Sequence, residues 1–212
     1  LEGKEGSVTV IGAVSPQGGD FSEPVTQNTK RYVRTFWGLD RALAYARHFP
    51  SINWLTSYSE YADDLRPWYA EHVGPEFVTC RHQMAHLLQK ESELMEIVKL
   101  IGADILPEDQ KLIIETAKLF RVGFLQQNAY HAIDTYVPLD KQLRMMELML
   151  KLYHGAKDIV SRAIPLSQLK ETGIFESLAK MKYEVPNDGQ EKFAEYDAAI
   201  EDALRQVNEA NR

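Results

Sequence analysis

Hydrophobic and polar positions follow one spacing near the N-terminus and another over the rest of the chain. The run "SVTVIGAV" at residues 7–14 is apolar at nearly every position and rich in β-branched side chains. A run that is apolar on both faces is typical of an interior strand in a parallel sheet covered on both sides. We therefore predict a buried strand over residues 8–14, which leads into the loop "SPQGGDFSEPVTQNT" at 15–29.

This predicted strand lacks convincing neighbours in the chain. A parallel strand pairs with other strands through crossover connections. The best second candidate is the short run "HFPSINWL" at 48–55, and no further run has the character of an interior strand. The strand and its loop therefore indicate the end of a larger α/β domain, with Leu1 as a cut through that domain rather than a natural start.

From residue 27 onwards, apolar residues recur every three or four positions, which is the spacing of one helix face. This pattern predicts a helix over 27–47 and a second helix that Pro67 opens and Gly74 interrupts. A long helix then runs to Gly102, which is placed as a C-terminal cap.

Three more helices are predicted beyond the acidic turn "ADILPEDQ" at 103–110. The first begins at Pro107, the second covers roughly 139–162, and the third occupies the tail after "VPNDG" at 185–189. The predicted fold class is mainly α: a helical bundle from about residue 65, preceded by a strand and loop from an α/β domain.

Composition and charge narrow the class of protein. Hydrophobic residues make up 44% and charged residues 26%, as in ordinary globular proteins. The net charge of −7 argues against a general nucleic-acid binder. No window approaches the ~20 apolar residues of a membrane span, and the N-terminus lacks the layout of a signal peptide. The single cysteine, Cys80, excludes an internal disulfide and suits a reducing cytosol. These features favour a protein of the cytosol or one peripheral to a membrane.

Two histidines, His82 and His86, have the spacing of zinc ligands on a helix. In zinc proteases of that pattern a glutamate follows the first histidine as general base, whereas this chain has Gln83 there. Histidines on a solvated or packed helix face are the more common occurrence, so we predict no metal site. No G-x-S-x-G nucleophile motif is present either.

The glycines of "QGGD" at 17–20 could turn backbone N–H groups toward a phosphate, because a helix N-terminus follows them. The chain, however, has no G-x-x-x-x-G-K-[ST] motif, and no lysine directly follows these glycines. The residues leave two interpretations open: a plain tight turn, or a turn beside a nucleotide that another loop binds.

Two aromatic residues also have two interpretations. Phe49 precedes a proline, and Tyr130 ends the stretch "FLQQNAY". Such rings usually lie in the core. A pair of them can also sandwich an adenine ring between their π faces. Periodicity and composition do not decide between these.

Four stretches in the same order resemble the catalytic A subunit of V-type and A-type rotary ATPases, and prokaryotic members most of all. They are "GSVTVIGAVSPQGGDFSEPVTQNT", "FWGLDRALA", "RHFPSINWLTSYSEY" and "GFLQQNAYHAIDTY". The resemblance extends to about residue 162. It implies that residues 1–64 are the end of a truncated P-loop-type α/β nucleotide-binding domain and that residues 65–212 are the C-terminal helical domain.

In that family the P-loop and the carboxylate that polarises the attacking water lie upstream of this stretch, and an arginine finger comes from the neighbouring B subunit. The resemblance therefore implies no catalytic residue and no metal ligand within this chain. It implies that Phe49 stacks on adenine and that Gln126 and Tyr130 form the other wall of the pocket. ATP or ADP with Mg²⁺ would bind the intact subunit, and none is expected to bind this chain tightly by itself.

The acidic turn matches the position of the loop that contacts the rotor in this family. The resemblance thus implies rotor contact by Asp104, Ile105, Leu106, Pro107, Glu108 and Asp109. The alternative is an acidic helix start on a solvated face. In the loop at 15–29, Asp20 and Glu23 are candidates for a subunit interface or for helix caps.

The resemblance implies a function for the intact subunit. It would hydrolyse or make ATP and couple this reaction to proton or sodium transport through rotation of a central stalk. Its partners would be B subunits in an alternating A/B hexamer and the stalk subunits, without nucleic acid, and it would reach the membrane only indirectly from the cytoplasm. Without a P-loop, this chain alone should be inactive. The alternative is a free-standing helical interaction module that binds no nucleotide.

Overall fold

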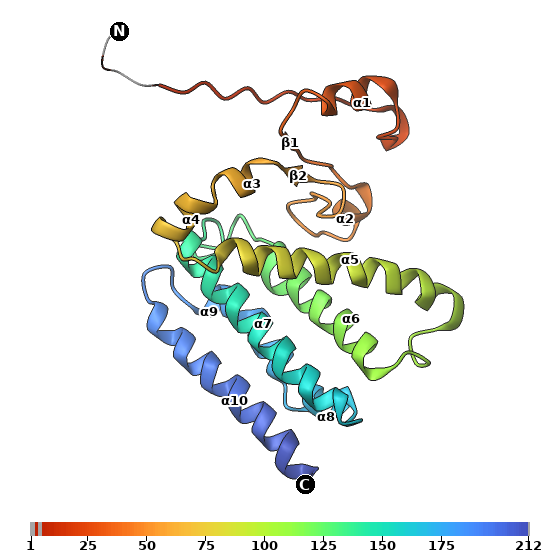
Figure 1. The fold of residues 1–212 in the computed structure, drawn as a ribbon, viewed down its shortest axis with the longest axis vertical. Coiled ribbons are helices and arrows are strands. Elements are labelled where there is room, and N and C mark those ends of the chain that lie inside the picture. Colours follow the sequence, from red (N-terminus) through yellow and green to blue (C-terminus); the bar gives the residue numbers. More distant parts are fainter. Residues whose placement is uncertain (1–2, 4–5, 212) are drawn as a thin grey trace.

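A small N-terminal part stands above a larger body of packed helices in the computed structural model (Figure 1). The structure describes residue 3 and residues 6–211, so the first residues of the predicted 1–64 segment lie outside the described part. The elements of the N-terminal part are η1 (Gln17–Gly19), α1 (Pro24–Lys30), β1 (Thr35–Phe36), α2 (Arg41–Tyr45), β2 (Tyr58–Ser59) and α3 (Tyr61–Asp64). The helical body comprises α4 (Arg66–His72), α5 (Phe77–Ile101), α6 (Glu108–Phe120), η2 (Arg121–Leu125), α7 (Leu139–Ser161), α8 (Leu166–Glu171), α9 (Ile174–Glu184), η3 (Gln190–Lys192) and α10 (Phe193–Ala210).

The segment predicted as a buried strand, residues 8–14, is exposed and unpaired. It extends away from the body (Figure 1), and Val8, Val10 and Ile11 are 92%, 87% and 79% exposed. An interior strand needs a strand on each side to take up its N–H and C=O groups. The described part of the chain offers no such neighbours, so this prediction of a buried strand is wrong for the chain as it stands.

The sheet of the N-terminal part is small and antiparallel instead. β1 pairs with β2, with Thr35 opposite Ser59 and Phe36 opposite Tyr58. The second predicted strand, 48–55, contributes only a single bridge between Ile52 and Leu39. Its residues otherwise form a loop.

The helix predicted over 27–47 is wrong, because the chain breaks it into two short helices. α1 is capped by Glu23, whose carboxylate accepts hydrogen bonds from the amides of Val25 and Thr26 at 3.2 and 3.0 Å. β1 follows, since its residues pair with a strand that is distant in sequence, and Asp40 then caps α2. Long-range pairing thus overrides the local helical spacing.

The predictions for the helical body are confirmed in outline. Pro67 lies in the first turn of α4, and α5 ends at Gly102, whose φ of 85° is left-handed and suits a glycine. α7 matches the helix predicted over 139–162, and α10 matches the predicted tail helix. Pro107 directly precedes α6 rather than lying inside it.

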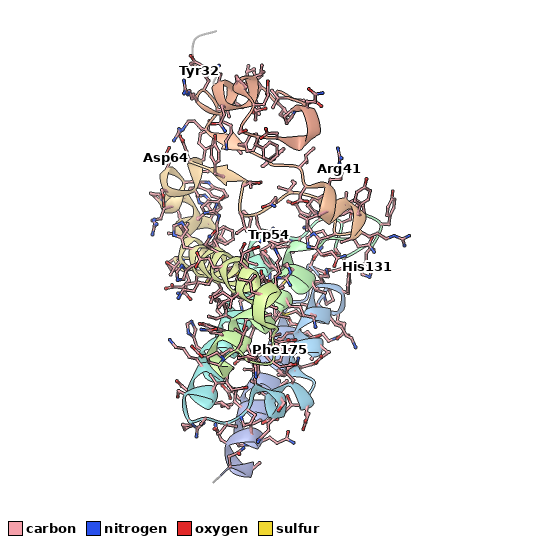
Figure 2. All side chains as sticks on the ribbon, turned by 90° about the vertical axis from the view of Figure 1, so that its right-hand side faces the viewer. Tyr32, Arg41, Trp54, Asp64, His131 and Phe175 are labelled. Carbon is pink, nitrogen blue, oxygen red and sulfur yellow. The ribbon has the colours of Figure 1, made fainter. Side chains whose placement is uncertain are left out.

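One core fills the body, between the apolar faces of α5, α6, α7, α9 and α10. Each large apolar side chain that folding buries contributes roughly 1.5–3 kcal/mol. Figure 2 shows Phe175 inside this body and Trp54 at its boundary with the N-terminal part. The largest apolar side chains that are buried almost completely are Leu112, Phe120, Met145, Leu148, Met149, Leu152, Ile159, Leu169, Leu178, Met181 and Phe193.

Helix α6 does not stop cleanly but runs into a single wider turn, η2, of the π type. Such turns inside or at the end of α-helices occur frequently at functional sites. Gly123 in this turn packs so closely on α9 that an added Cβ would lie 3.1 Å from the Cα of Ala179. The residues that follow this turn, from Gln126 onwards, therefore lie at the boundary with the N-terminal part.

Candidate functional site

Three consecutive residues of the N-terminal part are hydrogen bonded to the end of α6 and the loop after it. The amide of Gln127 donates to the carbonyl oxygen of Phe49 at 2.7 Å. The side-chain amide of Gln126 donates to the carbonyl oxygen of Arg47 at 3.2 Å, and His48 Nε2 lies 3.1 Å from the carbonyl oxygen of Arg121. Residues 47–49 and residues 121–127 therefore form one junction.

The predicted base-binding residues occupy this junction to different extents. Phe49 takes part through its carbonyl oxygen, which accepts from the amide of Gln127, and Gln126 takes part through its side-chain amide, which donates to Arg47. The Phe49 ring is 53% exposed. Tyr130 lies farther along the same loop, and its side chain is 100% exposed. Both rings are thus free to contact a planar ligand, but the structure does not stack one directly against the other.

A cavity of about 280 Å³ lies beside the junction, between the N-terminal part and the body. Because the Nε2 atom of His48 faces a carbonyl oxygen, that nitrogen carries the hydrogen and donates it. The other ring nitrogen, Nδ1, is buried without a hydrogen-bond partner. The cavity is lined by His48, Pro50, Ile52, Trp54, Phe124, Leu125, Gln127, Asp134, Val137, Gln142 and Met145.

Polar side chains hold the loop after η2 in shape. Asp134, only 2% exposed, accepts a hydrogen bond from the amide of Asn128 at 2.6 Å. The side-chain amide of Asn187 donates to the carbonyl oxygens of Ile133 and Tyr136 at 3.0 and 2.7 Å. The loop that carries Tyr130 is therefore fixed at its base by residues distant in sequence.

Two fully buried lysines lie behind this loop. Lys182 on α9 donates from Nζ to the carbonyl oxygens of Val122 and Gln126, at 2.8 and 2.5 Å. Lys141 on α7 donates to the carbonyl oxygens of Lys182 and Val185, at 3.1 and 2.7 Å. Burial lowers the pKa of both ammonium groups, and the nearby charge of Asp134 opposes that shift.

Sequence reasoning missed these lysines because lysine is normally a solvated residue. A signal was nevertheless present for one of them. Lys182 continues the spacing of Phe175, Leu178 and Val185, which defines the buried face of α9. A lysine on an apolar stripe indicates a buried partner for its ammonium group.

An ion pair ties η2 to α5. Arg121 NH1 lies 2.5 Å from Glu91 Oε1, and the two side chains are 26% and 10% exposed. This pair fixes the start of η2, as Lys182 fixes its end.

The residues predicted to contact the rotor form the tip of the α5–α6 hairpin, which protrudes from the body (Figure 1). Asp104, Pro107 and Asp109 are exposed, and Ile105 is 70% exposed. Leu106 is buried. Glu108 accepts hydrogen bonds from the amide of Leu166 and from Lys111, at 2.7 and 2.9 Å, and these bonds lower the pKa of its carboxyl group.

The structure places the remaining candidates on the surface or in turns. The turn at Gly18 and Gly19 has left-handed φ values of 69° and 77°, and Asp20 accepts hydrogen bonds from Ser22. His82 and His86 are exposed on α5. Within residues 3 and 6–211, no three His, Cys, Asp or Glu side chains are grouped to hold a metal ion. None of the helices in that part of the chain is long and apolar enough to cross a membrane.

Two sequence families match the chain in succession. The nucleotide-binding domain of the ATP synthase alpha/beta family matches residues 1–59, and the C-terminal domain of V and A type ATP synthase matches residues 66–170. The chain therefore belongs to the ATP synthase alpha/beta family. Within it, the chain belongs with the A subunits, or alpha chains, of V-type and A-type ATP synthases.

Individual relatives agree with this membership. The chain is 56% identical to the V-type ATP synthase alpha chain 2 of Clostridium tetani over 188 residues, which are 89% of the chain and 32% of that protein. It is 49% identical to the V-type ATP synthase alpha chain of Halothermothrix orenii over 199 residues, 94% of the chain and 34% of the relative. It is 50% identical to the A subunit of the A-type ATP synthase from Methanosarcina acetivorans over 189 residues, which are 89% of the chain and 33% of that protein. The chain thus spans about a third of the length of these relatives.

Proposed function

We propose that this chain is the C-terminal part of the catalytic subunit of a rotary ATPase. The intact subunit hydrolyses or makes ATP and couples the reaction to proton or sodium transport. Support comes from the two family matches in succession and from relatives that are named as V-type and A-type ATP synthase subunits. The P-loop and Mg²⁺ that phosphoryl transfer needs would be supplied outside this chain, so the chain alone is inactive.

The specific role proposed for this chain is to hold the adenine base of ATP or ADP. Phe49 forms one wall by stacking, and Gln126 and Tyr130 form the other. The observation that carries this proposal is the hydrogen bond from the amide of Gln127 to the carbonyl oxygen of Phe49, which joins both walls at one junction. The exposure of both aromatic rings leaves their faces available to a base.

A base held at this junction would touch both the nucleotide-binding part and the helical body. Nucleotide occupancy can then favour one angle between them over another, which is how hinged domains respond to ligands. The exposed residues at the tip of the α5–α6 hairpin, Asp104, Ile105, Pro107 and Asp109, would transmit this movement to a central stalk. The proposed assembly is a hexamer of alternating A and B subunits at the cytoplasmic face of the membrane.

The test is Tyr130→Ala in the intact enzyme that contains this chain. Loss of one stacking ring removes about 1–3 kcal/mol of base binding, so KM for ATP should rise roughly fivefold or more. Tyr32→Ala is the matched control, because Tyr32 is also highly exposed, at 87%, but lies at the opposite end of the N-terminal part from the junction (Figure 2). An unchanged KM for Tyr130→Ala would remove Tyr130 from the site.

A further inference from the structure

The ammonium group of Lys182 is buried and directed at the end of η2. The residue is 2% exposed, and its Nζ donates to the carbonyl oxygens of Val122 and Gln126. A lysine is rarely removed from water unless its charge meets several acceptors. The burial of Lys182 therefore indicates a specific task for these two hydrogen bonds.

The two carbonyl groups need such a donor. The last carbonyls of a helix have no intrahelical N–H partner, and they carry partial negative charge. Here the chain leaves the helical path after Leu125, with the amide of Gln126 donating to the carbonyl oxygen of Arg121 at 2.9 Å. A cation at this end satisfies the free carbonyls of Val122 and Gln126 and stabilises the point at which the chain turns toward Tyr130.

One peptide group links Lys182 to the base site. The carbonyl of Gln126 and the amide of Gln127 belong to the same planar unit. Lys182 donates to the oxygen of this peptide group, and the N–H of the same peptide group, which belongs to Gln127, donates to the carbonyl oxygen of Phe49. The unit is thus held from both sides. Hydrogen bonds in such a chain polarise one another, so the ammonium group also strengthens the bond to Phe49.

We propose that Lys182 is a positioning residue for nucleotide binding: it fixes the Gln126–Gln127 peptide group and thereby the distance between Phe49 and the loop that carries Tyr130. The inference rests on the proposed base site. Lys182 touches neither the base nor the phosphates in this role. It acts through the backbone of Gln126.

The experiment replaces Lys182 with methionine, which keeps most of the length of the side chain and removes the donor. In the intact ATPase, Lys182→Met should raise KM for ATP at least about fivefold and change kcat less than about twofold, because a displaced wall weakens binding of substrate and transition state alike. Lys182→Arg, which keeps a cationic donor, should recover most of the affinity.

Another lysine of α9 provides a matched control. Lys180→Met makes the same change at an exposed position and should alter neither KM nor the melting temperature.

The outcomes separate the inference from the function on which it rests. If Phe49→Ala raises KM and Lys182→Met lowers only the melting temperature, Lys182 is a stabilising residue and the inference is wrong. If neither Phe49→Ala nor Lys182→Met changes KM, the proposed base site is wrong, and the inference about Lys182 is wrong with it. If Lys182→Met does not assemble, Lys182→Gln, whose side chain is shorter and carries no charge, is measured in its place against the same criteria.

Discussion

The amide of Gln127 donates a hydrogen bond of 2.7 Å to the carbonyl oxygen of Phe49. This bond joins the N-terminal part to the helical body through backbone atoms alone. Changes to the Phe49 ring therefore leave the junction itself in place. Function and stability of the junction can be tested separately for this reason.

The ion pair between Arg121 and Glu91 should contribute measurably to stability. Arg121→Met leaves the carboxylate of Glu91 buried without its partner, so the free energy of unfolding should fall by about 2 kcal/mol, less than for a fully buried pair because the Arg121 side chain keeps 26% of its surface exposed. Urea denaturation of the 212-residue chain measures this change.

The exposed pair of Lys99 and Glu96 is the control, with side chains 64% and 71% exposed. Lys99→Met should change the free energy of unfolding by less than about 0.5 kcal/mol. The double variant Arg121→Met with Glu91→Leu should recover part of the loss, since no unpaired charge remains. Equal effects of Arg121→Met and Lys99→Met would contradict the importance assigned to the η2 pair.

Gly123 should not tolerate a side chain. A Cβ at this position would lie 2.8 Å from the Cε of Met149 and 3.1 Å from the Cα of Ala179. Met149 can move, but the backbone of α9 can do so only at the expense of its packing, so Gly123→Ala should lower the free energy of unfolding by about 1–3 kcal/mol. Gly12→Ala should have no effect, because nothing lies within 4 Å of its Cβ. An unchanged denaturation midpoint for Gly123→Ala would show that η2 and α9 can separate enough to accommodate a methyl group, contrary to their close packing in the structure.

Cys80 makes the stability of the chain depend on alkaline pH. Burial, together with the charges of Glu147 and Glu76, raises the pKa of the Cys80 thiol from 9.0 to about 11. The folded state therefore keeps the proton that the unfolded state loses above pH 9, and the resulting stability is complete below pH 9 and disappears as pH rises through 11.

Comparison with Cys80→Ala isolates this effect from other groups that titrate in the same range. The difference in unfolding free energy between the two chains, measured by urea denaturation, should shift in favour of the alanine variant from pH 9 to pH 11. A difference that stays constant over this range would mean that the thiol ionises normally in the folded chain.

Local signals were sufficient to predict most of the helical body, but no helix was predicted where α8 and α9 lie. α7 and α10 follow an uninterrupted helical spacing, and Pro67 and Gly102 mark a beginning and an end by their own backbone preferences. The C-terminal domain could therefore be outlined from the sequence, because its contacts join successive amphipathic helices.

Features that depend on distant partners could not be predicted in this way. Phe36 belongs to a helical pattern but pairs with Tyr58 in a sheet, and the apolar run at 8–14 lies exposed because its partners are not among the described residues. The assignment of Phe49 and Gln126 to a base site is a proposal, and it came only from the family resemblance. The acceptors of Lys182 could not be predicted, since they are carbonyl groups and backbone atoms are not visible in a residue pattern, although its place on the apolar face of α9 marks it as buried.

The central claim, that Phe49 stacks on the adenine base, is tested most directly by KM for ATP in two variants of the intact enzyme. Phe49→Ala removes the ring and should raise KM about fivefold or more, whereas Phe49→Tyr keeps an aromatic face and should stay within about twofold of the parent. The backbone bond from Gln127 remains available in both variants. An unchanged KM for Phe49→Ala would contradict the account, and the junction would then be a structural contact without a nucleotide.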